Sequence, residues 1–358
     1  MSVSYGGDSI VFADGSVNAS GFIGNRNRII NGAMVIDQRN AGASVTPTAT
    51  GGSGTYTLDR WNLYISQASK LSIQQNAGAV TPPTGFGNYL GATSLSAYSI
   101  GVSDYFFLWQ AIEGFNTTDL AWGTASAATV TLSFWVRSSL TGTFGGSLRN
   151  SAANRSYPFT YTISSANTWE QKSITVAGDT SGTWIGATNG VGMYVNFGLG
   201  VGSTYSGTAG SWAAANYLSA TGATSVVGTN GATFYITGVQ LERGSTASSF
   251  EYRSYGAELQ LCQRYYFVLP GFYIEGYANA GSIRAVNTPM AFPVQMRATP
   301  TRTVITAGGF NNVRGSSTSF AGLGIVGLSS THASASIEST AAGFTQYNNA
   351  TEAMSAEL

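Results

Sequence analysis

The sequence predicts an all-β protein, in which a jelly-roll β-sandwich is followed by a short helical linker and a second, smaller β domain. Composition is the first reason: the 358 residues include 46 glycines, and 12% are aromatic whereas only 9% are charged. Disordered chains have few aromatic residues and many charges. Aromatic segments separated by Gly, Thr and Asn instead form short strands joined by turns. We therefore expect a folded chain of short strands.

The second reason is an alternation of apolar and polar residues in three segments, 58–65, 130–137 and 192–200. Such alternation buries one face of an antiparallel strand and leaves the other face wet. The predicted buried residues are Trp61, Leu63 and Ile65, then Val130, Leu132, Phe134 and Val136, then Met193, Val195, Phe197 and Leu199. Because each apolar face needs a facing sheet to cover it, we expect a sandwich or a jelly roll.

The third reason is a change of face within one strand. The apolar alternation that starts at Phe234 moves to the opposite face at Val239. The Thr237-Gly238 pair lies between the two parts of the strand. An extra residue in a strand resets the alternation in this way, so the pair predicts a β-bulge.

The composition divides the chain into three parts. Residues 1–25 are Gly-rich and weakly patterned and predict an N-terminal arm, whereas residues 26–253 contain the strands of the sandwich. Charged residues gather between 242 and 264, and helix formers at 258–267 predict a short linking helix in a C-terminal β domain over 254–358. In that domain we expect strands at 265–274, 282–290 and 301–305, and an extended loop or edge strand at 292–300.

The composition also excludes several classes of function. Lys and Arg number 16, as do Asp and Glu, so the net charge is zero and no basic stripe exists to bind nucleic acid. With one cysteine, Cys262, and one histidine, His332, we predict no disulfide framework, no metal site and no cofactor. We expect Cys262 to be buried near the linking helix and His332 to lie on a surface loop. The sequence shows neither an export signal nor an apolar run of about 18 residues, so we expect no membrane insertion.

Five motifs follow one another along the chain. They are Asn27-Arg28-Ile29-Ile30-Asn31-Gly32 with Asp37-Gln38-Arg39; Tyr56-Thr57-Leu58-Asp59-Arg60-Trp61; Gly238-Val239-Gln240-Leu241-Glu242-Arg243-Gly244 with Phe250-Glu251-Tyr252-Arg253; Glu258-Leu259 with Cys262-Gln263-Arg264-Tyr265-Tyr266; and Phe292-Pro293-Val294 with Met296-Arg297-Ala298-Thr299-Pro300-Thr301. In this order and spacing they resemble bacteriophage tail-fibre and head-fibre proteins that carry a carbohydrate-binding-module-like domain.

This resemblance implies a jelly-roll sandwich in a homotrimeric fibre, located as an appendage on the surface of the virion. It also implies that the arm of residues 1–25 anchors the chain to other virion proteins and that exposed loops face host-surface polysaccharide. The resulting interpretation is a structural fibre protein that mediates host attachment. Two alternatives stay open: a capsid decoration, head-fibre or baseplate protein without a ligand, and a polysaccharide-degrading tail spike.

Enzymatic activity has little support in the sequence. Glycoside hydrolysis usually needs two carboxylates about 5–10 Å apart on a cleft. Asp104 could pair with Glu113, and Asp119 is a further candidate, but 16 acidic residues supply such pairs in any β protein. The chain also lacks the long repetitive β-helix segments of dedicated depolymerase spikes. We therefore predict no catalytic residues.

Sugar binding is the better functional hypothesis. Saccharide sites stack the apolar faces of sugar rings on exposed aromatic side chains, while polar groups fix the hydroxyls. The candidate ligand-binding residues are Trp109, Trp122, Trp184 and Trp212, of which the last two lie in loops rich in Gly and Ser. Each could instead pack inside the fold or against a neighbouring subunit.

Other residues within the motifs are predicted to serve the fold. We expect Trp61 in the core and Asp59 bonded to nearby backbone. Glu242, Glu251 and Arg253 are expected to form a salt-bridge network that closes the domain. The motifs are therefore interpreted as signatures of folding, with no direct contact to a ligand.

Overall fold

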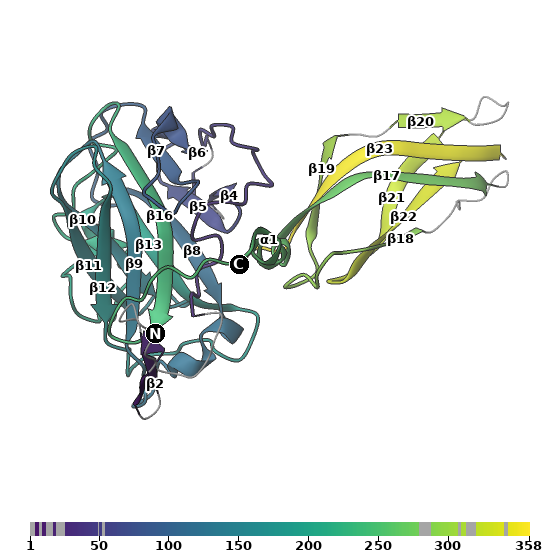
Figure 1. Ribbon diagram of the computed structural model, residues 1–358. Helices are drawn as coiled ribbons and strands as arrows, with labels where there is room; N and C mark the ends of the chain where they lie inside the picture. Colours follow the sequence, from purple (N-terminus) through teal and green to yellow (C-terminus); the bar gives the residue numbers. More distant parts are fainter. Residues whose placement is uncertain are drawn as a thin grey trace. The chain divides into compact units, whose positions relative to one another are not determined.

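The computed structural model describes residues 4–6, 9–11, 17–18, 26–48, 50–51, 54–278, 288–306, 309–312, 320–339 and 343–358. They form two compact units, one of residues Met1–Tyr255 with Leu358 and one of residues Gly256–Glu357 (Figure 1). Much of the predicted arm, residues 1–25, lies outside the described residues. Its described part is one antiparallel sheet of three short strands, β1 (Ser4–Gly6), β2 (Ser9–Val11) and β3 (Val17–Asn18).

The first unit is a sandwich of two antiparallel sheets, as the sequence predicts. One sheet has six strands in the order β11-β10-β13-β8-β5-β4. Their bounds are β4 (Thr55–Leu58), β5 (Trp61–Ile65), β8 (Tyr105–Glu113), β10 (Gly142–Arg149), β11 (Ser156–Ile163) and β13 (Val191–Val201).

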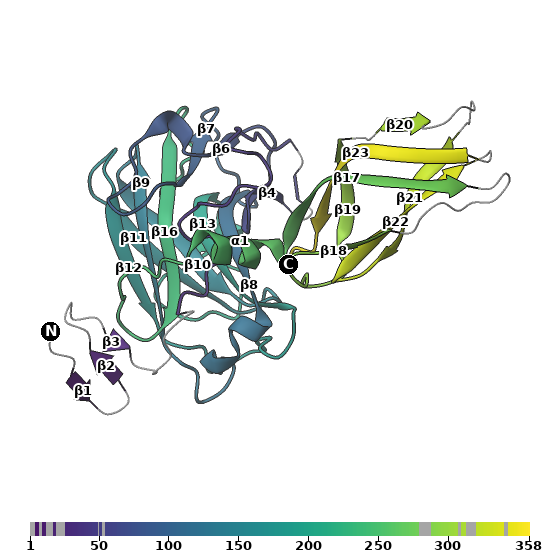
Figure 2. The same ribbon diagram turned by 45° about the vertical axis from the view of Figure 1, so that its right-hand side comes forward.

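The facing sheet has five strands in the order β12-β9-β16-β7-β6, and Figure 2 shows β12, β9 and β16 running side by side. Their bounds are β6 (Leu71–Gln75), β7 (Leu90–Ser94), β9 (Val130–Ser138), β12 (Glu170–Val176) and β16 (Thr233–Arg243). The chain passes repeatedly from one sheet to the other, which gives the jelly-roll connectivity. A two-strand parallel pair, β14 (Ser206–Gly207) with β15 (Ser219–Ala220), lies outside both sheets.

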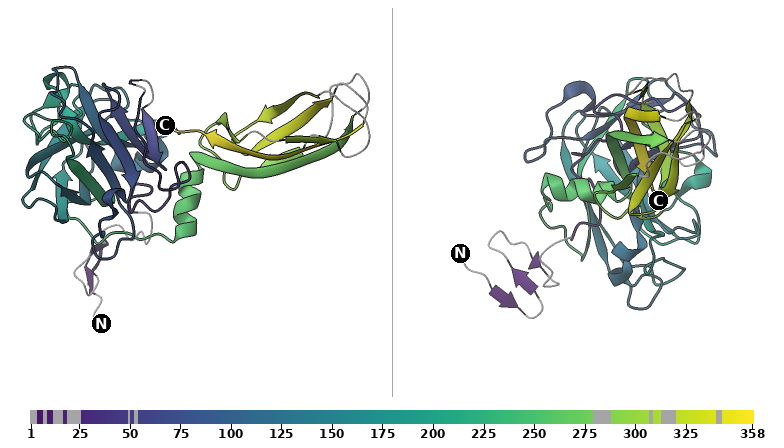
Figure 3. Two further views of the ribbon diagram at one scale, coloured as in Figure 1. Left: turned by 90° about the horizontal axis from the view of Figure 1, so that it is seen from above. Right: turned by 90° about the vertical axis from the view of Figure 1, so that its right-hand side faces the viewer.

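The second unit begins with the linking helix, α1 (Tyr255–Gln263), seen as a green coil in Figure 3. Cys262 lies in this helix and is buried, as expected. No helix in the described part of the chain is long and apolar enough to span a membrane. The strands that follow are β17 (Tyr266–Ala278), β18 (Thr288–Ala291), β19 (Thr301–Thr306), β20 (Gly309–Asn312), β21 (Phe320–Leu328), β22 (His332–Ser339) and β23 (Gly343–Ser355).

One expectation for this unit is corrected. His332 is exposed, but it begins strand β22 instead of lying in a loop, because it pairs with Ala291 of β18. Of the strand expected at 282–290, residues 288–290 lie in β18, and residues 282–287 lie outside the described residues. The loop expected at 292–300 contains no strand.

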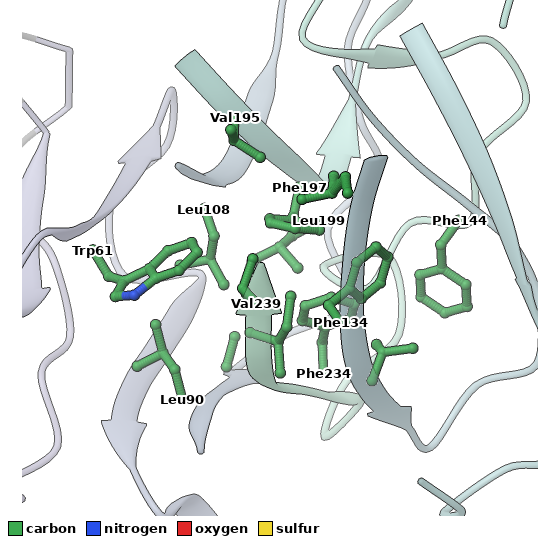
Figure 4. Close-up of a cluster of buried hydrophobic side chains, with 14 of the residues drawn as sticks. Trp61, Leu90, Leu108, Phe134, Phe144, Val195, Phe197, Leu199, Phe234 and Val239 are labelled. Atoms are coloured by element: carbon green, nitrogen blue, oxygen red, sulfur yellow. The ribbon is translucent and has the colours of Figure 1, made fainter. Parts of the chain in front are cut away.

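The hydrophobic core of the first unit lies between its two sheets, where aromatic rings from both sheets meet (Figure 4). The ring centroids of Phe134 and Phe197 are 5.0 Å apart at 77°, an edge-to-face contact across the sandwich. All the predicted core residues of segments 130–137 and 192–200 are fully buried. Figure 4 labels Trp61, Leu90, Leu108, Phe134, Phe144, Val195, Phe197, Leu199, Phe234 and Val239.

The predicted β-bulge is confirmed. The pairing of β16 with β9 shifts register between Thr237 and Gln240, and Gly238 has a positive φ of 60°. A Cβ at Gly238 would lie 2.6 Å from Cζ of Phe86, so the bulge needs glycine for both its backbone conformation and its space.

The segment 58–65 is a hairpin, not a single strand. Asp59 and Arg60 form the turn between β4 and β5, and Arg60 adopts a positive φ of 71°. Asp59 accepts hydrogen bonds from the Gln38 backbone N–H (2.7 Å) and side-chain amide (2.8 Å), so its predicted structural role is confirmed. Trp61 is fully buried and donates its indole N–H to the Asn31 carbonyl at 3.0 Å.

A clasp of polar groups joins the two ends of the sandwich. Glu251 Oε2 accepts the backbone N–H of Asn27 at 2.6 Å, and the Arg253 guanidinium donates to the carbonyls of Asn27 and Ile29. Glu242 holds the preceding turn by accepting two hydrogen bonds from Ser248, at 2.8 and 2.7 Å. The predicted domain-closing network is present, although most of its bonds are to backbone rather than between charges.

Candidate functional site

The outer face of the six-stranded sheet carries aromatic side chains where the sequence predicts a wet, polar face. On β8 the residues that point away from the core include Tyr105, Phe107 and Trp109, and the last two are only 3% and 8% exposed. Tyr64 of β5 and Tyr194 of β13 flank them and are half-buried. We call these five residues the aromatic face. The expectation of a solvated outer face is wrong for this sheet, because the large rings of these residues cover one another and exclude water.

The rings of the aromatic face contact one another in two groups. Tyr64 and Tyr105 are stacked, with centroids 5.4 Å apart and an interplanar angle of 13°. Tyr205 meets Tyr105 edge-on at 5.6 Å and 83°. In the other group Tyr194 meets Trp109 edge-on at 5.0 Å and 71°. The half-buried tyrosines therefore present both ring faces and edges at the surface of the sheet.

Polar groups without partners lie beneath these rings. Trp109 is paired with Asn196 of β13 in the sheet register. Trp109 Nε1 and Asn196 Oδ1 are both buried, and neither has a hydrogen-bond partner among the residues that the structure describes. A buried donor or acceptor without a partner typically costs about 1–3 kcal/mol. Both atoms are buried, so this cost is carried by the fold itself.

An arginine borders the aromatic face on β10. The Arg149 guanidinium lies over the Tyr194 ring at 4.6 Å and donates to Asn216 Oδ1 at 2.6 Å. Burial lowers the pKa of Arg149 from its ordinary value, and burial raises the pKa of Tyr194. Burial likewise raises the pKa of Tyr105. The phenols are therefore neutral at physiological pH, and their hydroxyls can both donate and accept.

A loop covers one end of the same sheet face. Strand β15 passes over Gly145 of β10 and Gly198 of β13, where an added Cβ would lie 2.6 Å from the Ser219 hydroxyl in both cases. The sheet accepts this close passage only because both positions lack a side chain. The loop thus covers the sheet at these two glycines, and Tyr64, Tyr105 and Tyr194 of the aromatic face stay partly exposed.

Three of the four predicted tryptophans gather in loops of the sandwich, and Trp109 lies apart from them. Trp122, Trp184 and Trp212 meet pairwise edge-to-face, with ring centroids 4.8, 5.2 and 5.5 Å apart. We call them the tryptophan cluster. Each indole N–H is donated to a backbone carbonyl of a loop: Trp122 to Ala128 (2.7 Å), Trp184 to Ser181 (3.2 Å) and Trp212 to Ala177 (2.8 Å).

A buried ion pair fixes the loop that carries Trp184. Arg155 donates to both oxygens of Asp179, at 2.7 and 2.6 Å, and the Asp179 side chain is 2% exposed. Hydrogen bonding to Asp179 raises the pKa of Arg155, although its partial burial acts in the opposite direction. A Cβ on Gly182 would lie 2.5 Å from the Arg155 side chain, so this loop packs directly on the ion pair. The tryptophan cluster is therefore rigid.

The acidic residues considered for catalysis do not form a pair on a cleft. Asp104 precedes β8 and Glu113 is the last of its nine residues, so the extended strand holds them about 30 Å apart. Asp104 accepts hydrogen bonds from Ser66, Tyr98 and the Gly101 N–H. Asp119 is paired with Arg28 at 2.6 Å. No group of three or more potential metal ligands occurs in the described part of the chain.

Sequence reasoning overlooked the tyrosines of the aromatic face. The signal was present, because Tyr105, Phe107 and Trp109 alternate with the core residues Phe106 and Leu108 along one strand. It was hidden because the run Tyr105-Phe106-Phe107-Leu108-Trp109 is apolar on both faces. Arg149 and Tyr194 carry no motif at all, and only the sheet register brings them together.

Comparisons with known proteins complete the description of the site. No protein-family model matches the chain, and no curated protein matches its sequence. Among solved structures, the enzymatically active domain of tailspike protein 4 of bacteriophage CBA120 is 13% identical, with a TM-score of 0.30; the match covers 56% of this chain and 22% of that one. The chain thus spans less than a quarter of the tailspike's length.

Two further matches are to structures that the chain spans almost completely. A putative sugar-binding protein from Bacteroides thetaiotaomicron is 11% identical with a TM-score of 0.35, over 61% of this chain and 100% of that one. The family 11 carbohydrate-binding module of a cellulosomal cellulase from Clostridium thermocellum is 11% identical with a TM-score of 0.27. That match covers 57% of this chain and 98% of the module. The chain is thus similar to a sugar-binding protein, a carbohydrate-binding module and a phage tailspike domain.

Proposed function

We propose that the protein binds glycans on the aromatic face of its six-stranded sheet. The observation that carries this proposal is the grouping of half-buried tyrosine rings with Arg149 on one face of the sheet. Pyranose rings have apolar faces that stack on aromatic rings and hydroxyls that need hydrogen-bond partners. Tyr64, Tyr105 and Tyr194 supply the rings, while Arg149 and the tyrosine hydroxyls supply donors at the edge.

The role of this binding is attachment. We propose that the chain forms a homotrimeric fibre on the surface of a phage particle, with residues 1–25 contacting other virion proteins and the sandwich contacting host-surface polysaccharide. The order of the five motifs supports this role. The net charge of zero favours close association of copies, and several weak sugar contacts on one trimer add by multivalency.

The proposed activity is binding without catalysis. Asp104 and Glu113 lie at opposite ends of one strand, far beyond the separation that glycoside hydrolysis requires. Measuring the release of reducing ends from capsular polysaccharide tests this part of the proposal. Release by the purified chain would contradict it.

A glycan array probed with the purified protein tests the binding itself. The decisive variant is Tyr64→Ala, which removes one of the two stacked rings. Tyr252→Ala is the matched control, because Tyr252 is 58% exposed and packs on Phe86 and Phe250, away from the aromatic face. We expect Tyr64→Ala to lose the array signal and Tyr252→Ala to keep it. Equal signals from both variants, or none from the wild type, would contradict the proposal.

The trimer is tested separately, by light scattering on the full chain and on a chain without residues 1–25. We expect a molar mass of three chains in both cases, because the β units build the trimer in this proposal. A stable monomer would rule the trimer out without affecting the assignment of the aromatic face.

A further inference from the structure

The tryptophan cluster borders a pocket that the aromatic face does not include. The pocket has a volume of about 230 Å³ and lies between the loops at residues 117–122 and 184–187. Its apolar walls are formed by Leu120, Trp122, Trp184, Ile185 and Met193. Pockets that bury most of a drug-sized ligand measure about 300–1,000 Å³. This smaller pocket therefore suits one ring or one substituent of a ring, rather than an oligosaccharide.

The hydroxyls that line the pocket have already donated their hydrogens. Thr117 donates to the Gly114 carbonyl at 3.0 Å, and Thr118 donates to the Gly186 carbonyl. The indole N–H groups of Trp122 and Trp184 are likewise donated to backbone carbonyls. What remains is the acceptor capacity of the two hydroxyl oxygens, because each keeps two lone pairs after donating its hydrogen. A complementary group must be apolar and offer a hydrogen-bond donor.

Charge is absent from the lining. The ten residues that line the pocket include no Asp, Glu, Lys, Arg or His. A carboxylate, phosphate or ammonium group would lose its hydration there without gaining a counter-charge, which is strongly unfavourable. A sugar face rich in hydroxyls would also be poorly satisfied, because its oxygen atoms would find no donor. An acetamido group offers a methyl for the tryptophan walls and an N–H for a threonine oxygen, and its carbonyl oxygen stays in water at the open side of the pocket.

We propose that this pocket binds the acetamido group of an N-acetylated amino sugar. The methyl packs against Trp122 and Trp184, and the N–H is donated to Thr118 Oγ1, the exposed hydroxyl of the two. Phe115 is 57% exposed and lies two residues before Thr117, held by a 3.0 Å bond from its N–H to the Thr188 carbonyl. Its ring forms a platform for the attached pyranose. The proposal concerns a second site, so it stands or fails independently of binding on the aromatic face.

The walls of the pocket are organised before the ligand arrives. The three tryptophans fix one another, and a Cβ on Gly114 would lie 2.8 Å from both the Ile185 side chain and the Thr188 carbonyl. A preformed pocket loses little conformational entropy on binding, so even a small group can contribute measurable affinity.

The test uses two neutral probes: the β-1,4-linked trisaccharide of N-acetylglucosamine and the corresponding glucose trisaccharide. Binding to the full chain is followed by calorimetry and by the indole N–H signals in NMR spectra, assigned with single Trp→Phe variants. We expect the acetylated probe to bind roughly tenfold more tightly, because it alone buries a methyl and gains a hydrogen bond. It should move the Trp122 and Trp184 signals.

Variants make the test specific. Ala187→Leu fills the pocket from its exposed rim, and Ala214→Leu places the same change on an exposed position of another loop. We expect the first to abolish the shifts of Trp122 and Trp184 and the second to preserve them. Thr118→Val should remove the preference for the acetylated probe, because the replacement keeps the shape but lacks the acceptor.

Three outcomes would overturn the proposal: equal affinity for the two probes, no movement of the Trp122 and Trp184 signals, or unchanged binding in Ala187→Leu. If the probes move only the Trp109 signal, the aromatic face binds sugar and the pocket does not. If they move only Trp122 and Trp184, the pocket binds these sugars and the aromatic face does not, and the glycan array then decides whether that face binds any other glycan.

Discussion

Removing the arginine of the buried ion pair beneath the tryptophan cluster should destabilise the sandwich strongly. In Arg155→Met the carboxylate of Asp179 keeps its position but loses two charge-assisted hydrogen bonds of 2.7 and 2.6 Å. What remains to it is the Ser181 N–H at 3.1 Å and the long 3.3 Å contact from Trp184. The Asp179 side chain is only 2% exposed, so water cannot replace the lost donors.

The size of the effect follows from the burial. Removing one partner of a buried pair costs about 3–5 kcal/mol. Because the Arg155 side chain is 17% exposed, we expect Arg155→Met to lower the free energy of unfolding by the smallest value in that range, about 3 kcal/mol. For a unit of this size that loss lowers Tm by roughly 6–12 °C.

Thermal and urea unfolding, followed by tryptophan fluorescence, measure the loss. Arg28→Met is the matched control, because its partner Asp119 is 48% exposed and such pairs contribute at most about 1 kcal/mol. Arg155→Lys should lie between the two variants, since lysine cannot make both bonds of the fork. If Arg155→Met and Arg28→Met cost the same, the ion pair does not hold the loop and the argument for a rigid cluster is refuted.

Three further predictions concern other parts of the sandwich. Although partial burial raises the pKa of Asp104, hydrogen bonds from Tyr98, the Gly101 N–H and Ser66 outweigh it and hold that pKa below the ordinary value of 3.8. A carboxylate with a depressed pKa stabilises the folded state above its unfolded pKa and loses that effect as pH falls. Asp104→Asn should therefore unfold at a lower denaturant concentration than wild type at pH 7. At the lowest pH of the series the two proteins should unfold at the same denaturant concentration. Gly198→Val should expel the loop at Ser219 and cost about 1–3 kcal/mol by overpacking, seen in urea unfolding as a lower midpoint. Tyr64→Phe should keep glycan affinity within about threefold of wild type if stacking dominates, whereas Tyr64→Ala should lose about tenfold, as measured by calorimetry on an array-identified glycan.

The sandwich could be predicted because apolar and polar residues alternate along its strands, and this alternation marks the buried face. Val130, Leu132, Phe134 and Val136 alternate with residues of the opposite face, and all four are fully buried. The hairpin at Asp59 and Arg60 could not be predicted in the same way. A tight turn with a positive φ at an arginine has no sequence signal.

The candidate sites were predictable only in part. Trp184 and Trp212 could be chosen from the sequence because they lie in loops and have no obvious partner in the core. In the structure they form one cluster with Trp122. Their convergence depends on three loops that are far apart in sequence, so no local pattern could reveal it. The aromatic face depends on the lateral order of β5, β8 and β13, which the sequence leaves open.

The clasp between Asn27 and Arg253 has a mechanical consequence. The segments that enter and leave the sandwich meet beside β16, the central strand of the five-stranded sheet, where Arg28 also donates its backbone N–H to the Leu241 carbonyl at 2.9 Å. Tension along the chain is therefore borne by a few bonds between Asn27–Ile29 and 241–253, and does not pass through the strand that carries Tyr64 or the loop that carries Trp184. A pulled molecule can keep both its aromatic face and its pocket in shape while the chain on either side is under load.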